Sequence, residues 1–280
     1  MKVGLVLEGG AMRGLYTAGV LDAFMDYDIK ANGLIGVSAG ALFGVNYISK
    51  QRGRTLRYNK KYVNDKRYMG LSSLIKTGNI INKEFAYYEV PFKLDKFDEK
   101  EFEKSKTKFY VVITNVETGE AEYPLVKNCE KEIETLRASS SMPFVSKMVE
   151  VDGKYYLDGA LADSVPYEKM MELGYDKLIV VLTRDINYRK KKRNPLFAKI
   201  FYKKYPNLVE KINSRYKVYN DSIDKLRKLE KEGKVIVIRP SKDLHVKRIE
   251  KNVDKLQAIY DLGISDVKNN LKKINKYLEK

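Results

Sequence analysis

Ser38 has the sequence setting of an activated nucleophile. Gly36 lies two positions before it and Gly40 two positions after it, between a short apolar run and a segment with helical spacing. A serine held at a sharp strand-to-helix turn is a nucleophile elbow, and its neighbours must be glycines because larger side chains would collide there. The following helix directs its N–H groups at the serine oxygen. The pattern therefore predicts attack by the Ser38 hydroxyl on a carbonyl carbon.

A glycine-rich turn precedes this elbow and also lies between an apolar run and a helical segment. Exposed N–H groups in such a turn bind an anion, either a phosphate or the oxyanion of a tetrahedral intermediate. A dinucleotide site is disfavoured, because Ala11 replaces a required glycine and Asp28 is poorly placed as a ribose ligand. The turn consists of Gly9, Gly10, Ala11, Met12, Arg13 and Gly14.

Asp158 is the candidate base. It begins the tripeptide Asp158, Gly159, Ala160, and an Asp-Gly pair by itself usually indicates a turn. Asp158 is nevertheless a candidate because a serine nucleophile needs a base, and the chain has only a single histidine, His245, that could serve instead.

The elements that must position these residues alternate along the chain. Short runs rich in Val, Ile and Leu predict strands buried on both faces, and stretches of helical periodicity separate them. This alternation predicts an α/β fold, a mostly parallel central sheet with helices on both faces. The predicted strands are residues 3–7, 34–37, 109–114, 178–183 and 235–239, with antiparallel additions at 120–126 and 154–157. The predicted helices are residues 15–25, 39–49, 130–137, 167–173, 216–232 and 253–278.

Composition limits the classes of protein and of site. The 280 residues, 44% hydrophobic and 32% charged, suffice for one large or two small domains with a sizeable core. Cys129 is the single cysteine, so internal disulfides and cysteine-built zinc sites are excluded, as are multi-histidine metal centres. We expect neither a metal nor an organic cofactor. Because no secretory signal and no run of roughly 20 apolar residues is apparent, we expect a soluble, cytoplasmic protein.

Positive charge is concentrated in the C-terminal part. The chain carries +17 overall, and residues 184–280 hold 28 Lys and Arg against 12 Asp and Glu. Solvated helices are the usual explanation, and a face meeting nucleic acid or anionic membrane is the alternative. Residues 187–194, which include a basic run from Arg189 to Arg193, are the least globular segment. Apolar residues at helical spacing follow, which predict a helix packed on the core or lying in a headgroup layer: Leu196, Phe197, Ile200, Phe201, Tyr205 and Leu208.

In order and spacing, the three motifs resemble those of the patatin-like phospholipase family of acyl hydrolases. Residues 111–119 and the Ala-Ser-x-x-x-Pro stretch at 138–143 add to the likeness, which spans about residues 2–183. The resemblance implies a three-layer patatin-like fold, with residues 1–183 as the catalytic core and the basic, mostly helical residues 184–280 completing the same domain.

The resemblance also implies the site. Ser38 would be the nucleophile and Asp158 a base acting on it directly, with an oxyanion hole formed by N–H groups around Gly10, Ala11 and Met12. Many family members have a third glycine in place of Ala11. The implied substrates are lipid acyl esters, with phospholipids, lysophospholipids and neutral glycerides all open, and peripheral contact with anionic membrane is compatible with the basic part.

Two alternatives remain at this point. The order Ser38, Asp158, His245 also matches an α/β-hydrolase triad, although in that fold several strands precede the elbow and His245 lies in a charged segment. A non-catalytic basic protein that binds lipid or nucleic acid would use the C-terminal charge, but no nucleic-acid recognition motif is present and no specific nucleic acid is expected. The oligomeric state is open.

Overall fold

The computed structural model describes residues 1–192, 194–243 and 245–279. A mixed sheet has the strand order β6-β7-β3-β2-β1-β8-β9, and the short strands β4 and β5 pair with β3. The strands are β1 (Val3–Leu7), β2 (Gly33–Val37), β3 (Lys108–Asn115), β4 (Ala121–Glu122), β5 (Leu125–Val126), β6 (Val149–Val151), β7 (Lys154–Asp158), β8 (Lys177–Val181) and β9 (Val235–Ile238).

Helices and turns separate the strands. The helical elements are η1 (Ala11–Gly14), α1 (Leu15–Asp26), α2 (Ala39–Ile48), α3 (Arg54–Tyr62), α4 (Leu71–Thr77), the π-helical η2 (Glu84–Leu94), α5 (Glu99–Lys104), α6 (Ile133–Ser139), η3 (Gly159–Leu161), α7 (Tyr167–Glu172), α8 (Pro195–Phe201), α9 (Pro206–Lys231) and α10 (Val253–Glu279).

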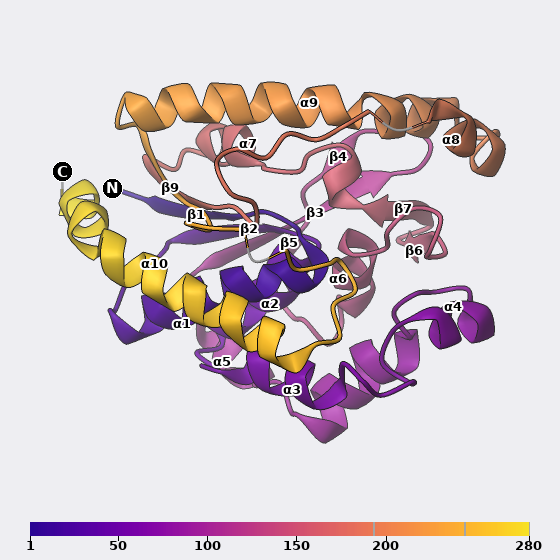
Figure 1. Ribbon diagram of the computed structural model, residues 1–280, viewed down its shortest axis with the longest axis horizontal. Helices are drawn as coiled ribbons and strands as arrows, with labels where there is room; N and C mark the ends of the chain where they lie inside the picture. Colours follow the sequence, from indigo (N-terminus) through magenta and orange to yellow (C-terminus); the bar gives the residue numbers. More distant parts are fainter. Residues whose placement is uncertain (193, 244, 280) are drawn as a thin grey trace.

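The central strands are buried on both faces. β1, β2, β3, β8 and β9 run parallel, whereas β7 is antiparallel to β3. Alternate residues point to opposite sides, so that Leu5 and Leu7 pack in the core beneath α1, α2 and α10 while Val6 packs toward α7 and α9. Figure 1 shows α7 and α9 on one side of the sheet and α1, α2 and α10 on the other. This arrangement confirms the expected α/β fold with a mostly parallel sheet.

The bounds of the central strands agree closely with those predicted from the sequence. The sequence patterns predict no element within residues 50–105. That segment contains α3, α4, η2 and α5, and β6 is a further strand that the sequence pattern did not indicate. The basic run predicted as non-globular leads into α8, and its last residue, Arg193, lies outside the described residues.

α10 crosses α1 at close range. A Cβ atom added at Gly19 of α1 would lie 2.0 Å from the carbonyl oxygen of Tyr260, and one added at Gly263 of α10 would lie 2.3 Å from that of Tyr16. Two glycines therefore let the helix backbones touch. Because α1 directly follows the glycine-rich turn, α10 also fixes the position of that turn.

Within the described part of the chain, no helix combines the length and apolar character needed to cross a membrane.

Candidate active site

Ser38 is the single residue between the end of β2 and the start of α2. Its backbone has φ 55° and ψ −122°, a conformation that side-chain-bearing residues rarely adopt and that costs of order 1–3 kcal/mol. A Cβ at Gly36 would lie 2.6 Å from Cα of Ala41, and one at Gly40 would lie 2.5 Å from the carbonyl oxygen of Leu7. Both glycines of the motif are therefore required by close backbone packing at the turn.

The sheet register brings Asp158 to this turn. β2 and β7 lie on either side of β3, with Val37 opposite Val112 and Asp158 opposite Ile113. Ser38 directly follows Val37, so it and Asp158 come to the same level along β3 from the two neighbouring strands. Both residues line the same cavity, and the Ser38 side chain lies close enough to the Asp158 carboxyl to act on its pKa.

The Asp158 carboxylate is buried at the end of β7. Burial raises its pKa above the ordinary carboxyl value, and the nearby Arg215 guanidinium, the N–H of Ala160 and the Ser38 hydroxyl act against that rise. The Ala160 N–H donates to Oδ1 of Asp158 at 2.9 Å. At Gly159 a Cβ would lie 2.1 Å from the carbonyl oxygen of Val112, so the motif residue after Asp158 must be glycine. A base with a raised pKa is better matched to taking a proton from a hydroxyl than an ordinary carboxylate is.

The glycine-rich turn leaves several of its N–H groups available. Met12 donates its N–H to the carbonyl oxygen of Arg248 at 3.2 Å, and Arg13 donates to that of Gly10 at 3.2 Å. The N–H groups of Gly9, Gly10 and Ala11 donate to no residue in the described ranges. All three residues line one cavity with Ser38 and Asp158. The candidate donors for an anion at this place are therefore among these three N–H groups.

The other turn residues have structural contacts. A Cβ added at Gly14 would lie 2.9 Å from Cβ of Ala39, and one added at Gly9 would lie 2.9 Å from Cβ of Ser38. The turn therefore packs directly on the elbow. Arg13 is 9% exposed, and burial together with the Arg184 charge lowers its pKa to about 10. Ala11 has φ 50°, the left-handed conformation in which many family members have glycine.

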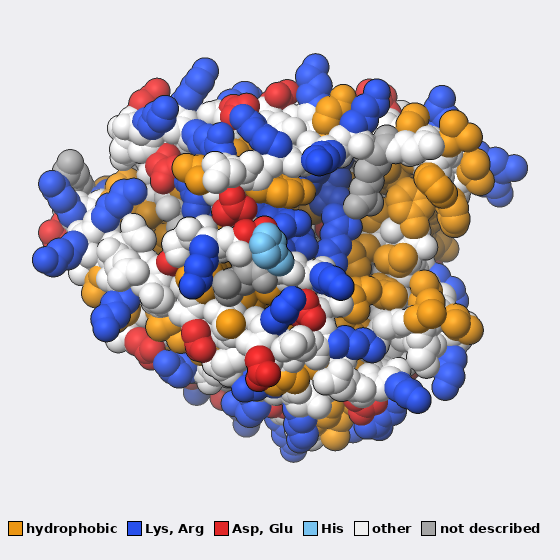
Figure 2. Space-filling model, in the orientation of Figure 1, with side chains coloured by type: hydrophobic (Ala, Val, Ile, Leu, Met, Phe, Trp, Pro, Cys, Tyr) orange, Lys and Arg blue, Asp and Glu red, His pale blue; other side chains and the backbone are white. Residues whose placement is uncertain are grey.

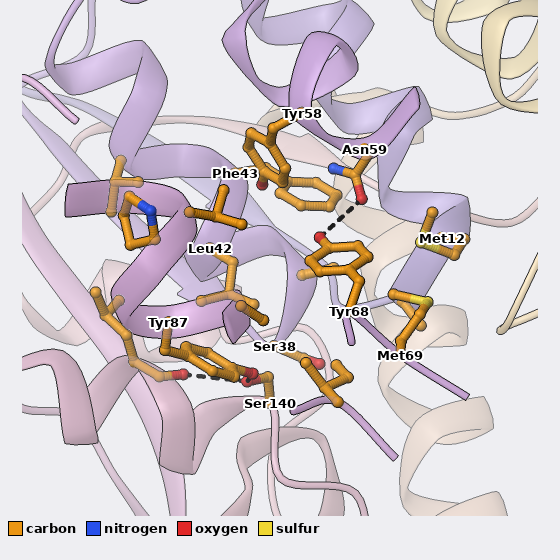
Figure 3. Close-up of a pocket in the computed structure, with 18 of the residues that line it drawn as sticks. Met12, Ser38, Leu42, Phe43, Tyr58, Asn59, Tyr68, Met69, Tyr87 and Ser140 are labelled. Carbon is orange, nitrogen blue, oxygen red and sulfur yellow. Dashed lines mark hydrogen bonds between the residues drawn. The ribbon is translucent and has the colours of Figure 1, made fainter. Parts of the chain in front are cut away.

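Ser38 also borders a second, apolar cavity, here called the apolar chamber (Figure 3). Its polar groups are satisfied internally: the Tyr68 hydroxyl donates to Oδ1 of Asn59 at 3.1 Å, and the Tyr87 and Ser140 hydroxyls are 2.7 Å apart. The tyrosines therefore offer their ring faces to the cavity. Its apolar lining includes Met12, Leu42, Phe43, Val45, Tyr58, Met69, Ile80, Ile81, Ala86, Val90, Phe92, Ile133 and Leu136.

On the other side of Ser38 lies a cavity of about 320 Å³, here called the cationic chamber, a size within the usual range for ligand sites. Its lining includes the carboxylates Glu8 and Asp158 and five cationic side chains: Arg13, Arg184, Lys190, Arg215 and Arg248. Figure 2 shows Lys and Arg side chains gathered along a hollow below α9, beside an edge rich in hydrophobic side chains.

Other candidates from the sequence lie elsewhere or are inert. His245 is 86% exposed in its side chain, its Nδ1 atom is 3.4 Å from Asp243, and Figure 2 shows it at the surface. It lines neither chamber. Cys129 is buried, and burial raises the pKa of its thiol, so it is not a thiolate nucleophile. Across the described residues, no group of three His, Cys, Asp or Glu side chains is arranged to hold a metal.

For two residues of the site, sequence reasoning did not predict the role that the structure gives them. Oγ of Ser139 accepts the N–H of Ser38 at 2.8 Å and so holds the elbow; its signal was the Ala-Ser-x-x-x-Pro stretch. Lys190 belongs to the supposedly non-globular basic run, but its side chain lies against the ring of Tyr219, 4.0 Å from the centroid, inside the cationic chamber.

Comparison with known proteins identifies proteins whose sequences are similar to this chain. The chain is 26% identical over 270 residues to the uncharacterized protein YjjU of Escherichia coli, a match that covers 94% of this chain and 75% of that protein. It is 25% identical over 186 residues to lysophospholipase nte1 of Aspergillus niger, covering 64% of this chain and 12% of that much longer protein. Among solved structures, VipD from Legionella pneumophila matches with 14% identity and a TM-score of 0.39, over 93% of this chain and 67% of that one.

Two family models match successive parts of the chain. Residues 205–279 match a domain of unknown function, DUF6363. Residues 5–171, more than half of the chain, match the model of patatin-like phospholipases, and this range contains the elbow, the glycine-rich turn and Asp158. The chain therefore belongs to the patatin-like phospholipase family, which implies a hydrolase acting on lipid esters.

Proposed function

We propose that this protein is a serine hydrolase of lipid acyl esters that uses Ser38 and Asp158 without a histidine. The observation that carries the proposal is the convergence of Ser38, at a strained elbow, and a buried Asp158 carboxyl on one cavity through the register of β2 and β7 on β3. An ester with an apolar acyl chain and a polar head fits the division between the apolar and the cationic chamber. His245 is exposed and lines neither chamber, so it does not support a histidine base.

The reaction follows from these positions. Asp158 takes the proton of the Ser38 hydroxyl as its oxygen attacks the ester carbonyl, and the N–H groups of Gly10 and Ala11 bind the developing oxyanion. Collapse of the intermediate breaks the ester bond, and Asp158 returns the proton to the leaving alcohol. Asp158 then takes a proton from the water that attacks the acyl-serine. It returns this proton to the Ser38 oxygen as the acyl–oxygen bond breaks, which releases the fatty acid and regenerates Ser38.

A fluorophosphonate probe tests the nucleophile directly. Such a probe labels an activated serine, so we expect one labelled site in the native protein and none in Ser38→Ala. In parallel, hydrolysis is screened across short-chain esters, lysophospholipids and diacyl phospholipids. Labelling without hydrolysis of any ester would contradict the hydrolase, and labelling that persists in Ser38→Ala would contradict the assigned nucleophile.

We also propose that the protein contacts anionic membrane through one edge. α4 and α8 lie at the same edge of the molecule, which Figure 2 shows to be rich in hydrophobic side chains. Large apolar side chains on both helices are more than half exposed, and exposed lysines lie beside them, a combination suited to an anionic headgroup layer. The apolar side chains are Leu71, Ile75, Leu196, Phe197, Ile200 and Phe201.

Vesicle sedimentation tests this edge. We expect binding to vesicles that contain phosphatidylglycerol, and weaker binding after combining Ile75→Ser with Phe197→Ser, one change on each helix. Val218→Ser on α9 is the matched control, because it also removes an exposed apolar side chain. Equal binding of all three proteins would eliminate the membrane edge while leaving hydrolysis of dispersed esters in place.

A further inference from the structure

We propose that residues of the C-terminal domain of unknown function form a brace that holds the glycine-rich turn in its oxyanion-binding conformation. The brace consists of Ser241, Arg248, Glu250 and Asp266, which all lie within the matched residues 205–279. The proposal rests on the hydrolase function above and adds a positioning role to it. Arg248 contributes its backbone carbonyl, and the other three residues act on the turn through their hydrogen bonds to neighbouring segments.

The glycine-rich turn needs support from outside. Ala11 has φ 50°, a left-handed conformation that is strained for a residue with a Cβ atom. Inside the turn, the Arg13 N–H donates back to the carbonyl of Gly10 at 3.2 Å, which is a long hydrogen bond. Strained backbone persists where the surrounding structure over-determines it. Contacts from the rest of the protein therefore have to hold this turn.

The first contact of the brace is made by a backbone carbonyl. The carbonyl oxygen of Arg248 accepts the Met12 N–H at 3.2 Å. The chain after Arg248 is tied to the buried carboxylate of Glu250, whose Oε1 accepts the N–H groups of Lys251 and Asn252, each at 3.1 Å. This contact occupies the Met12 N–H and sets how the turn lies against the cavity.

The second contact is made by the carboxylate of Asp266. Tyr16 is the second residue of α1, directly after the turn, and its hydroxyl donates to Oδ2 of Asp266 at 2.9 Å. The Ser241 N–H donates to the same oxygen at 3.0 Å. Both side chains are buried, and burial, followed by the Asp266 charge, raises the pKa of Tyr16, so its hydroxyl stays a donor. One carboxylate oxygen thus joins α1, α10 and the segment that leads to Arg248.

A second tyrosine–aspartate pair joins the same two helices away from the turn. The Tyr260 hydroxyl donates to Oδ2 of Asp22 at 2.6 Å, and the Gly53 N–H donates to the same oxygen at 2.8 Å. Both side chains are buried, as in the first pair. Asp22 lies six residues after Tyr16, about 9 Å further along α1. The two pairs thus match in chemistry and burial and differ in their distance from the turn.

The first test compares Tyr16→Phe with Tyr260→Phe. Each change removes one hydroxyl from a buried carboxylate and keeps the ring, so both should lower Tm by similar amounts. We expect Tyr16→Phe to lower kcat for a short neutral ester by about tenfold at unchanged KM, part of the roughly 100-fold to 1,000-fold cost of losing an oxyanion donor. Tyr260→Phe should keep the wild-type kcat. Equal kcat in both variants, or a loss that appears in KM alone, would overturn the positioning role.

Hydrogen exchange tests the brace without turnover. In Tyr16→Phe the Met12 N–H should exchange about tenfold faster than in the wild type, and in Tyr260→Phe its rate should be unchanged. Unchanged exchange in both variants would overturn the brace even if ester hydrolysis is found. Faster exchange in Tyr16→Phe, combined with no ester cleavage by the wild type, would refute the hydrolase function and leave the brace in place.

The wild type provides a measurement that needs no variant to fold. Because α10 carries Asp266, the Met12 N–H and the interior N–H groups of α10 should become exchangeable at the same denaturant concentration. Exchange at Met12 while α10 stays protected would overturn the brace.

Discussion

The apolar chamber and the cationic chamber meet at Ser38 but come from different parts of the chain. The apolar wall is built mainly from α2, α3, η2 and α6, in the first half of the sequence. The cationic wall takes Arg184, Lys190, Arg215 and Arg248 from the second half. Ser38, Asp158 and the glycine-rich turn lie within the family-matched core, where the sheet fixes their positions. The apolar wall belongs largely to this same core, whereas most of the cationic wall follows it in the sequence.

Removing the base tests the centre where the chambers meet. Asp158→Asn should lower hydrolysis of a short neutral ester by about 100-fold to 10,000-fold, the contribution of a general base. His245→Ala should leave the rate unchanged, because that side chain is exposed on the surface. Steady-state kinetics of both variants measure these rates. A large loss in His245→Ala and little loss in Asp158→Asn would contradict the dyad and favour a catalytic histidine.

Blocking the oxyanion donors tests the same centre from the glycine-rich turn. A Cβ at Gly10 would lie 2.7 Å from Oγ1 of Thr183, so Gly10→Val must displace the turn. Loss of one oxyanion donor costs roughly 100-fold to 1,000-fold in kcat, and we expect a loss of this size. Thermal unfolding of the variant separates a displaced turn from a misfolded protein. A folded variant with wild-type turnover would show that the anion is bound elsewhere.

The acid limb of the pH profile reports the base. Because burial raises the pKa of Asp158, its carboxylate becomes protonated at a higher pH than an ordinary carboxyl, and the protonated form cannot accept the Ser38 proton. On lowering the pH, kcat/KM for a neutral ester should fall about tenfold per pH unit below that raised pKa. A rate that stays constant down to the ordinary carboxyl range would contradict this assignment.

Filling the apolar chamber sharpens the contrast between the two cavities. Ala86→Leu adds volume to its lining from η2 and should reduce kcat/KM for long-chain esters relative to short ones by about tenfold, within the 1–3 kcal/mol associated with small changes in an apolar pocket. Turnover of a short-chain ester should not change. An unchanged chain-length preference in the folded variant would show that the acyl chain does not occupy the apolar chamber.

The smallest effect concerns the strain at Ala11. Ala11→Gly should raise the free energy of unfolding by about 1 kcal/mol, because an alanine at positive φ is strained and glycine is not. Gly53→Ala is the reverse control: Gly53 has φ +74° with nothing within 4 Å of an added Cβ, so the change should destabilise by a similar amount. Urea unfolding curves measure both. Destabilisation by Ala11→Gly would mean that the turn does not hold the left-handed conformation.

Local patterns were sufficient to predict the central parallel strands and the candidate site residues, but not β6. β1 has the predicted bounds, Val3–Leu7, because a buried parallel strand is a continuous apolar run. The elbow at Ser38 is visible because close packing at Gly36 and Gly40 permits no side chain. The pairing of Ser38 with Asp158 depends on the register of β3, which no local pattern encodes, and was reached from the family resemblance.

The chamber walls could not be predicted in the same way. η2 contains Pro91 and has no regular apolar period, so its place in the apolar wall depends on tertiary contacts. The charge of Lys190 was evident in the sequence, but charge alone does not distinguish a solvated lysine from one beside the ring of Tyr219.

The close crossing of α1 and α10 has a consequence for biosynthesis. Gly19 meets a helix that begins at Val253, and the Met12 N–H is held by the carbonyl of Arg248. A nascent chain emerging from the ribosome thus carries the elbow and Asp158 long before it carries the residues that brace the glycine-rich turn. The conformation of the glycine-rich turn next to Ser38 therefore depends on residues that are synthesised more than 200 positions later.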